Sequence, residues 1–495
     1  MKTYKINFIL FFILSTLSIA QEVEPEITLD RKKLVILSDE ENEITEKIYQ
    51  IASRSATKLK RYDVIDRGHL KRILKEQKLQ HSGVVDQDQA VEIGKVAAAK
   101  EALLIRIQNF GQKGVPKDNE ENEPRTGLIG WVIKEVVKAN IDKKTENVER
   151  YPNNINTIID AEIHLINVET SQSLASFNIH ADYTGGVKAK SLSHALNQIQ
   201  SQMYTNLKNL YQLTSEVLDI QGNDVTLLLG KDMGVNAGTL FEIITRDEKK
   251  TVRDRDITIP GTSVGFIKIE NVSIDACEGR VLRKWDDIEP GYQAHEITSI
   301  FTGGISGIYG SKPDNMRLRL LANIKPFNRF GGAFYADIGT VKDTWDDSDF
   351  HFGLGFSLNL RLIHTPFFSL GPVLNVPFDF PIRTDDENDM GESHLVVKAI
   401  TSPRLGLQSE IMLGSKIDLV IRGEYVLTSA NLGNWHYTEI KVGEEEETET
   451  WKANWNQPAP EINYQGWILT LGIRRTFFSS FTFNQSQISH LIFPP

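Results

Sequence analysis

The chain has 495 residues, enough for about two to four domains, because a single hydrophobic core rarely grows beyond about 250–300 residues. Its 40% hydrophobic and 24% charged residues are those of a folded protein, and its net charge of −11 argues against a nucleic-acid partner. The single cysteine, Cys277, excludes an intramolecular disulfide and a metal cluster held by thiolates.

Residues 1–20 have the pattern of a secretory signal peptide. Lys2 and Lys5 precede an apolar run, and the small residues Ser18 and Ala20 mark a cleavage site before Gln21. The run is shorter than the roughly 20 residues that a membrane-spanning helix needs, although an uncleaved anchor is the alternative. No cysteine lies near the cleavage site, so lipidation there is excluded. We therefore expect export across a bacterial inner membrane.

Residues 21–211 predict a periplasmic domain of alternating strands and helices. Short apolar strands are separated by segments in which apolar residues recur every three or four positions, as they do on one face of a helix. The expected strands are residues 33–37, 62–66, 102–107, 158–168 and 173–183, and the expected helices contain Ile48, Ile73, Ile93 and Ile199. This order predicts a two-layer α/β sandwich.

One run of residues in this domain carries a family resemblance. It comprises Asp63-Val64-Ile65-Asp66-Arg67, Leu70, Ile73-Leu74, Glu76-Gln77, Ser82-Gly83, Ala90, Ile93-Gly94, Ala99 and Leu103-Leu104. Across about residues 34–213 the chain resembles the CsgG family, which includes the curli secretion lipoprotein and related outer-membrane assembly factors. The chain lacks that lipoprotein's lipidated cysteine, and residues 111–156 are charged and helix-patterned where its pore hairpins are inserted. The resemblance thus implies an α/β periplasmic domain that tends to oligomerise.

Residues 127–141 form an apolar patch between two polar segments. Its candidate partner-contact residues are Leu128, Trp131, Val132 and Val136. Packing against the sandwich is one interpretation of the patch, and contact with a membrane surface or another subunit is the other. The histidines show no metal-ligand spacing, and no phosphate-loop, nucleophile or acid–base pattern is present. We therefore expect a protein that is not an enzyme and has no cofactor or metal site.

Residues 212–297 consist of short strands separated by glycine turns. Gly234 and Gly238 supply the backbone freedom that a tight corner of a small barrel needs. The pattern predicts a small SH3- or OB-like barrel, with Cys277 as a buried, unreactive thiol. This segment is similar to the C-terminal β-domain of the flagellar assembly protein FlgT, which is found next to CsgG-like domains.

Residues 298–478 alternate strictly between apolar and polar positions. We expect eight strands, near residues 300–310, 315–326, 331–341, 349–363, 366–379, 395–413, 416–428 and 463–477. Loops of alternating length, a polar face with glycines and both charge signs, and aromatic residues near strand ends predict an antiparallel transmembrane β-barrel. Those aromatic residues are Phe334, Tyr335, Phe378, Phe380, Trp467 and Phe477. The architecture resembles an OmpA-type barrel, and a soluble barrel or sandwich is the alternative.

Together these features predict a multi-domain α+β protein that acts as a periplasmic assembly or transport factor anchored in the outer membrane. Its expected partners are envelope proteins or further copies of itself, together with outer-membrane lipid. An eight-stranded barrel is filled by its own side chains, so it would anchor the protein and not conduct. The alternative is a soluble periplasmic or secreted binding protein whose third domain holds a ligand. We expect the acidic residues 444–449 to lie in an exposed loop, and residues 479–495 form a tail without an assigned role.

Overall fold

The structure is a computed structural model that describes residues 27–28, 30–40, 42–65, 87–116, 151–252, 255–298, 300–324, 328–387, 391–441 and 447–478. Several expectations concern residues outside these ranges: the signal peptide, the helix around Ile73, the apolar patch 127–141, the acidic residues 444–446 and the tail 479–495. In the described part, no helix is both long enough and apolar enough to cross a membrane.

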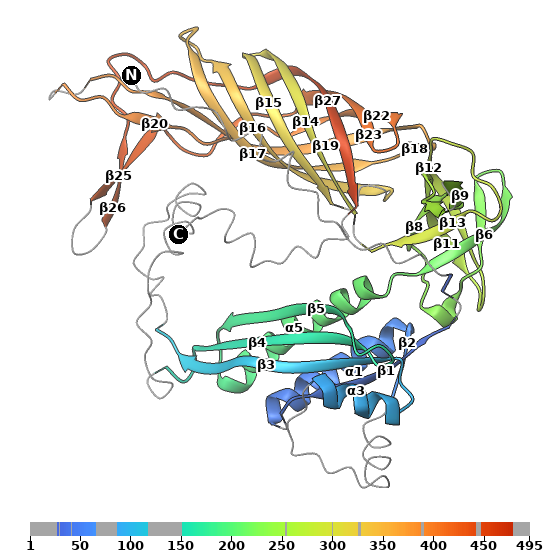
Figure 1. The fold of residues 1–495 in the computed structure, drawn as a ribbon. Coiled ribbons are helices and arrows are strands. Elements are labelled where there is room, and N and C mark those ends of the chain that lie inside the picture. The colour runs from blue at the N-terminus through green and yellow to red at the C-terminus, as the bar shows by residue number, and fades with distance from the viewer. Residues whose placement is uncertain are drawn as a thin grey trace.

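The first domain is built on a five-stranded sheet (Figure 1). Its strands, in the spatial order β2-β1-β3-β4-β5, are β2 (Tyr62–Val64), β1 (Lys32–Ser38), β3 (Glu101–Gly114), β4 (Ile155–Asn167) and β5 (Ser173–Thr184). Strand β1 runs parallel to β2 and β3, whereas β3, β4 and β5 are antiparallel. The described helices are α1 (Glu43–Leu59), α3 (Gln87–Val96) and α5 (Lys188–Leu210).

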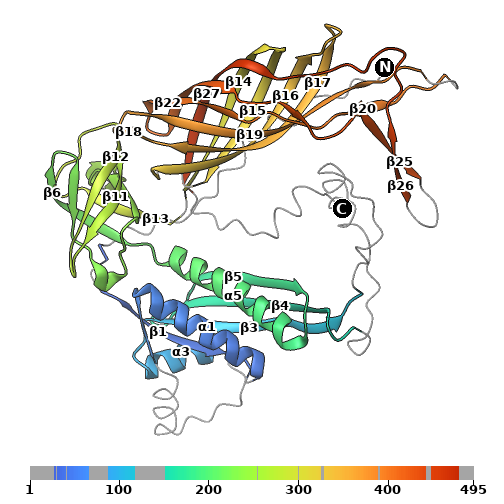
Figure 2. The ribbon, with the colours of Figure 1, turned by 180° about the vertical axis from the view of Figure 1, so that it is seen from behind.

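Helices cover both faces of this sheet. Helices α1 and α5 pack on one face, so α5 lies behind the sheet in Figure 1 and in front of it in Figure 2. Helix α3 packs on the other face, where Ala90 and Ile93 meet Val35 and Leu104. The predicted two-layer sandwich was therefore incomplete, because a third, partial layer is present. The apolar run Leu34–Leu37 is buried throughout, and a strand buried on both sides needs cover on both faces.

Local residue choice explains where α1 begins and ends. The side chain of Asn42 accepts a hydrogen bond from the backbone N–H of Thr45 at 2.8 Å, which caps the first turn. Glu43 and Glu46 add negative charge where the helix dipole favours it. The helix stops at Lys60, which adopts a left-handed conformation with φ of 58°.

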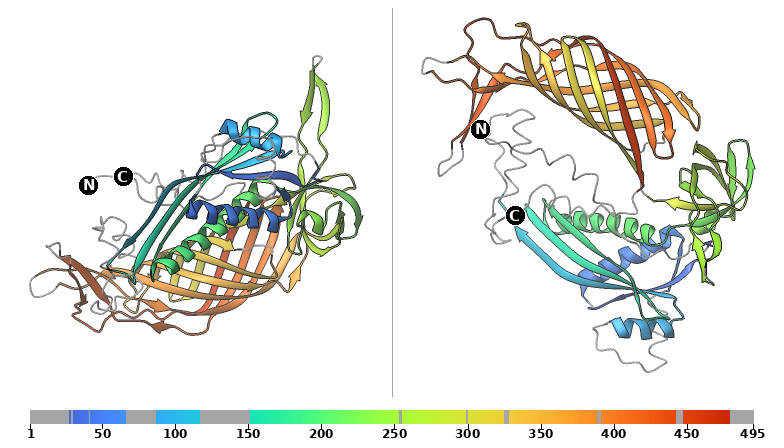
Figure 3. Two further views of the ribbon diagram at one scale, coloured as in Figure 1. Left: turned by 90° about the horizontal axis from the view of Figure 1, so that it is seen from below. Right: turned by 45° about the horizontal axis from the view of Figure 1, so that its top comes forward.

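The second domain is a closed six-stranded barrel, as the glycine-rich pattern predicted. Its strands, in order around the barrel, are β11 (Ser263–Val272), β12 (Cys277–Lys284), β7 (Asp224–Leu227), β6 (Thr214–Gln221), β13 (Gln293–Ile297) and β8 (Leu240–Ile244). A short 3-10 helix, η2 (Lys231–Met233), follows β7. The hairpin of β9 (Glu248–Val252) and β10 (Arg255–Ile259) projects from the barrel (Figure 3).

Gly234 shows why the turn after η2 requires glycine. Its φ of 81° is left-handed, and a Cβ atom there would clash with the carbonyl oxygen of Leu59 at the end of α1. The turn after η2 thus touches the first domain. Gly238 also has a positive φ, of 93°, which confirms the predicted need for backbone freedom at both positions.

Cys277 is buried in the core of the six-stranded barrel, with 2% of its surface exposed. Burial raises the pKa of its thiol to about 12, so almost no thiolate forms at neutral pH. We expect a thiol reagent at pH 8 to label Cys277 only after the protein is unfolded in guanidinium chloride. Rapid labelling of the folded protein would contradict this placement.

The third domain is a closed eight-stranded antiparallel barrel with tilted strands (Figure 3). Its strands are β14 (Ile300–Lys312), β15 (Asp314–Ile324), β16 (Phe330–Lys342), β17 (Ser348–Leu360), β19 (Phe368–Thr384), β22 (Arg404–Gly414), β23 (Ile417–Val426) and β27 (Gln465–Phe478). Pairing of β14 with β27 joins the ends of the domain, and pairing of β17 with β19 closes the ring. The predicted strand number is confirmed.

The sixth predicted strand is shorter than expected. Residues 395–413 were predicted as one strand, but β22 begins at Arg404, directly after Pro403, which cannot donate a ladder hydrogen bond. Short strands flank the barrel instead: β18 (Ile363–His364), β20 (Leu395–Val397), β21 (Ile400–Thr401), β24 (Ala430–Asn431), β25 (His436–Lys441) and β26 (Glu447–Lys452). The two long loops, residues 385–403 and 427–464, lie at the same end of the barrel, as predicted. The turn between β14 and β15 at that end is tight.

Candidate functional site in and around the eight-stranded barrel

The outside of the eight-stranded barrel is an apolar belt. Outward-facing side chains from neighbouring strands are each between 36% and 61% exposed. They are Ile305, Leu318, Leu320, Phe334, Ile338, Phe356, Leu358, Leu405, Leu407, Ile421, Leu469, Leu471 and Ile473. Strand register makes the belt continuous, since Ile305 lies opposite both Leu320 and Ile473. Water-soluble monomers rarely expose a continuous apolar surface of this extent, whereas membrane barrels present one.

Aromatic residues border this belt at both ends of the strands. Tyr425 and Trp467 pack edge-to-face at 5.3 Å near one end, and Phe301 stacks on Phe477 at 5.0 Å at the other. Trp467 and Phe477 therefore lie where the sequence predicted a girdle. Tyr335 does not: it points inward and its ring covers the guanidinium of Arg319 at 3.7 Å. Strand parity explains the error, because adjacent residues face opposite sides.

Ion pairs cross the middle of the barrel interior. Arg319 donates two hydrogen bonds to Asp337, at 2.7 and 2.8 Å, and both side chains are fully buried. Asp379 accepts from Arg317 at 3.3 Å and from Arg404 at 3.2 Å. Paired geometry of this kind offsets the cost of removing charges from water.

A second buried network lies closer to the six-stranded barrel. Both carboxylate oxygens of Glu410 accept hydrogen bonds from Arg474, at 2.7 and 2.8 Å. Arg361 donates to the same carboxylate at 3.2 Å, and Ser369 donates at 3.0 Å. These side chains come from strands β19, β22 and β27 and from the residue after β17, so the network ties opposite walls together.

The six-stranded barrel closes one mouth of the larger barrel. Arg283, from β12, forms an ion pair with Asp418 on β23, and both side chains are almost fully buried. Burial, together with the nearby positive charge of Arg474, lowers the pKa of Arg283 to about 10. Lys268 from β11 also donates to the side chain of Asn328 at 3.0 Å. These contacts fix the second domain against the mouth of the third.

We expect Arg283→Ala to loosen this junction by about 1–3 kcal/mol, because the buried carboxylate of Asp418 then keeps only one of its two arginine partners, Arg474. Limited proteolysis between the two barrels should then be faster. Arg280→Ala on the same strand is the control, since Arg280 is 57% exposed and makes only exposed ion pairs. Equal proteolysis of the two variants would contradict a structural role for the junction.

An apolar cluster closes the other mouth. Its members come from the strand ends and from the two long loops. They are Ile308, Val341, Val396, Ile400, Val426, Trp435, Ile462, Tyr464 and Ile468. Trp435 donates its indole N–H to the carbonyl of Pro460 at 2.7 Å, and the hydroxyl of Tyr464 lies 2.9 Å from Nδ1 of His351. The described side chains thus cover both mouths of the barrel.

An open groove of about 830 Å³ lies outside the eight-stranded barrel, between the first domain and the six-stranded barrel. It is lined by Asp30, Arg31, Lys33, Asp63, Lys95, Ala98, Ala99, Lys100, Val168, Glu169, Asp232 and Met233. Arg31 crosses it, donating to the carbonyl of Asp232 at 3.0 and 2.8 Å. The buried pair of Arg61 and Glu296, at 2.8 Å, also joins the two domains.

The four predicted partner-contact residues, Leu128, Trp131, Val132 and Val136, lie outside the described residues. Sequence reasoning missed Arg61 and Arg283, whose buried ion pairs join neighbouring domains. Each stands 135 or more positions away from its partner, and no local pattern marks either one. Among the described residues, no group of three or more histidine, cysteine or acidic side chains is placed to hold a metal ion.

No protein-family model matches the chain, and no curated protein matches it by sequence. Among solved structures, the chain is similar to a major outer membrane protein from Thermus thermophilus, with 13% identity and a TM-score of 0.25. It is also similar to lipoprotein GNA1162 from Neisseria meningitidis, with 13% identity and a TM-score of 0.22. Each match covers 36% of this chain and 99% of the other. Similarity at this level assigns no family, so the function rests on the geometry of the chain.

Proposed function

We propose that this protein is anchored in the bacterial outer membrane by its eight-stranded barrel and presents its first domain to envelope proteins in the periplasm. The observation that carries the proposal is the continuous apolar belt around a closed barrel. A bilayer covers such a belt, and the closed ring leaves no unpaired strand edge within the lipid. The interior is crossed by ion pairs and closed at both mouths, so the barrel serves as an anchor and not as a pore.

The arrangement of loops supports one orientation. The end that faces the six-stranded barrel has the short connections around residues 325–329, 361–367 and 415–416. The opposite end has the two long loops. Bacterial barrels place short turns in the periplasm and long loops outside the cell, so the first two domains would lie in the periplasm. The signal-peptide pattern at the N-terminus agrees with this direction of export.

The CsgG-like pattern supports a role for the first domain in assembly or transport through protein contacts. The buried pair of Arg61 with Glu296 and the junction at Arg283 hold this domain at a defined place relative to the barrel. The groove crossed by Arg31 offers both charge signs to a partner. Electrostatic complementarity of this kind selects partners and speeds their association.

Cell fractionation and gel mobility test the membrane anchor. The full chain is expected in the outer-membrane fraction, extracted only with detergent, and to change its mobility on heating because a folded barrel migrates differently from an unfolded chain. Added protease should cut the long loops in intact cells and reach the first domain only after the outer membrane is opened. Recovery in the soluble fraction without detergent would refute the proposal.

Substitution of the groove lysines tests the partner contact. Lys95→Glu with Lys100→Glu reverses two exposed charges that line the groove, so crosslinks from the first domain to envelope proteins should be lost. Lys188→Glu with Lys190→Glu is the control, because these exposed lysines begin α5 away from the groove lining. An unchanged crosslinking pattern in the groove variant would exclude the groove as the contact.

A further inference from the structure

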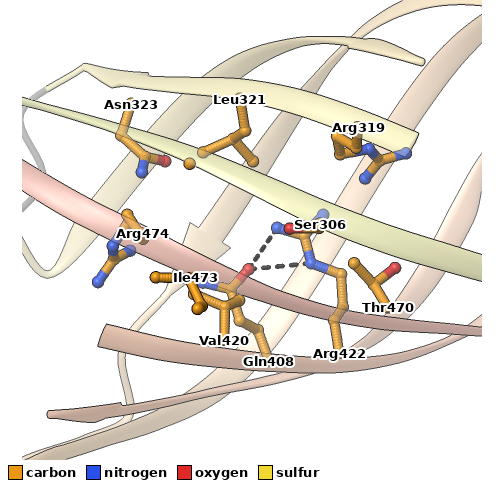
Figure 4. A pocket seen from close by; sticks show the side chains of 11 residues that line it. Ser306, Arg319, Leu321, Asn323, Gln408, Val420, Arg422, Thr470, Ile473 and Arg474 are labelled. Carbon is orange, nitrogen blue, oxygen red and sulfur yellow. Dashed lines mark hydrogen bonds between the residues drawn. The ribbon is translucent and has the colours of Figure 1, made fainter. Parts of the chain in front are cut away.

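We propose that the eight-stranded barrel binds one small monatomic anion, such as chloride, in its interior. A cavity of about 20 Å³ lies between β14, β15, β22, β23 and β27 (Figure 4). It is lined by Gly304, Ser306, Arg319, Leu321, Asn323, Gln408, Val420, Arg422, Thr470, Ile473 and Arg474. Three of these side chains are arginines and none is a carboxylate. A polar cavity of this volume holds about one water-sized occupant and is not expected to stay empty.

Arg422 is the side chain that most requires an anion. It is 3% exposed. Its guanidinium donates two hydrogen bonds to the side-chain oxygen of Gln408, and the bond from Nε is 3.0 Å long (Figure 4). Its other hydrogen bond goes to the amide oxygen of Asn375, at 3.4 Å. Both acceptors are neutral, and no described carboxylate forms an ion pair with Arg422. Arg319 and Arg474 each contact a carboxylate, whereas Arg422 is attracted only at longer range, mainly by Glu424. A buried cation without a contacting counter-charge is costly.

The one inward carboxylate next to Arg422 on its own strand does not fill this role. Glu424 accepts a hydrogen bond from Asn375 through one oxygen, and its other oxygen is buried without a partner. Asn375 thus sits between the two charges, with its amide oxygen toward Arg422 and its amide nitrogen toward Glu424. Glu424 therefore attracts Arg422 through space without contacting it, and the guanidinium of Arg422 remains beside the cavity.

Two other side chains that line the cavity each carry a buried polar atom without a hydrogen-bond partner. These atoms are Nη1 of Arg319 and Oγ1 of Thr470. Buried polar atoms are normally satisfied, so an unpaired N–H and an unpaired hydroxyl on one cavity indicate an occupant that accepts hydrogen bonds. Water accepts and donates, whereas a halide ion only accepts and also balances the charge of Arg422. A chloride ion is little larger than water, while phosphate and sulfate are too large for this space.

An occupant held only by the folded barrel makes stability depend on the anion. When the chloride concentration is ten times the dissociation constant, the unfolding equilibrium constant should fall about elevenfold. This change in the unfolding equilibrium constant should depend on which anion is present and not on ionic strength, because general screening by salt does not distinguish chloride from gluconate. The proposal does not depend on the partner of the first domain.

Urea unfolding of the full chain in detergent micelles tests the site. We expect sodium chloride and sodium bromide to lower the unfolding equilibrium constant about tenfold relative to sodium gluconate at equal ionic strength. Crystals soaked in bromide should show an anomalous peak beside Arg422, Arg319 and Thr470. Equal stability in chloride and gluconate, or a cavity without bromide, would overturn the proposal in favour of water.

Variants assign the effect to this cavity. Arg422→Gln removes the unpaired charge and is expected to abolish the difference between chloride and gluconate. Thr470→Val removes one donor without changing the charge, and it should weaken the halide dependence several-fold. This variant tests the site even if Arg422→Gln does not fold. Arg280→Gln, an exposed arginine of the six-stranded barrel, should leave the dependence intact. A halide dependence that persists in both cavity variants would place the anion elsewhere.

Discussion

Leu320→Arg is expected to destabilise the eight-stranded barrel by about 2–4 kcal/mol when the protein is folded into lipid vesicles. Leu320 lies near the middle of β15, is 52% exposed, and faces Ile305 across the ladder. If the belt contacts acyl chains, the new guanidinium must be buried in hydrocarbon near the membrane midplane. Urea titration of the heat-dependent gel mobility measures the loss.

Leu432→Arg is the matched control for this experiment. Leu432 has a similar exposure of 55% but belongs to the long loop after β23, outside the belt. Its substitution should change stability by no more than about 0.5 kcal/mol, as is usual for surface positions. In a water-soluble barrel both substitutions would add a solvated charge and both would be nearly neutral. A small effect of Leu320→Arg in lipid would therefore refute the membrane anchor.

Asp337→Leu is expected to destabilise the barrel by about 3–5 kcal/mol, because it leaves the guanidinium of Arg319 buried without its two hydrogen bonds. The double variant Arg319→Leu with Asp337→Leu should recover much of this loss, since the unpaired charge is then absent. Urea unfolding of the two single variants and the double variant gives the coupling energy between the side chains.

The exposed pair of Lys342 and Asp346, at 2.8 Å, serves as the control for the buried pair. Lys342→Ala should leave the stability nearly unchanged, because solvent screens this interaction and hydrates the remaining carboxylate. A loss for Asp337→Leu that is no larger than the loss for Lys342→Ala would show that the interior is open to water. The barrel would then be a candidate for conduction.

The strands of the barrel show how far local pattern reaches. Alternation of apolar and polar residues assigned the faces of β14 to β27, since successive side chains point to opposite sides of a strand. The same reasoning failed for Tyr335, which was grouped with its neighbour Phe334 by residue type although parity places it inside. It also extended β22 through Pro403, because the loop before it contains short apolar strands of its own.

The first domain shows where local pattern is insufficient. The run Leu34–Leu37 is apolar at every position, which is typical of a strand covered on both faces, but it does not say which helix covers which face. Helix α3 takes the second face because the parallel pairing of β1 and β3 brings Val35 beside Ala102. Pairing between strands that are distant in the sequence therefore determines which helix covers each face.

The sequence by itself determined the closed small barrel and an eight-stranded barrel with an apolar exterior. It also predicted an export signal, which lies outside the described residues. These features follow from composition and from periods of two to four residues, which are local properties. Only the tertiary structure decided which charges meet: Arg61 with Glu296, Arg283 with Asp418, and Arg422 without a carboxylate in ion-pair contact. The physical reason is that an ion pair depends on distance in space, and the packing of one domain against the next brings together residues that the chain separates by a hundred positions or more.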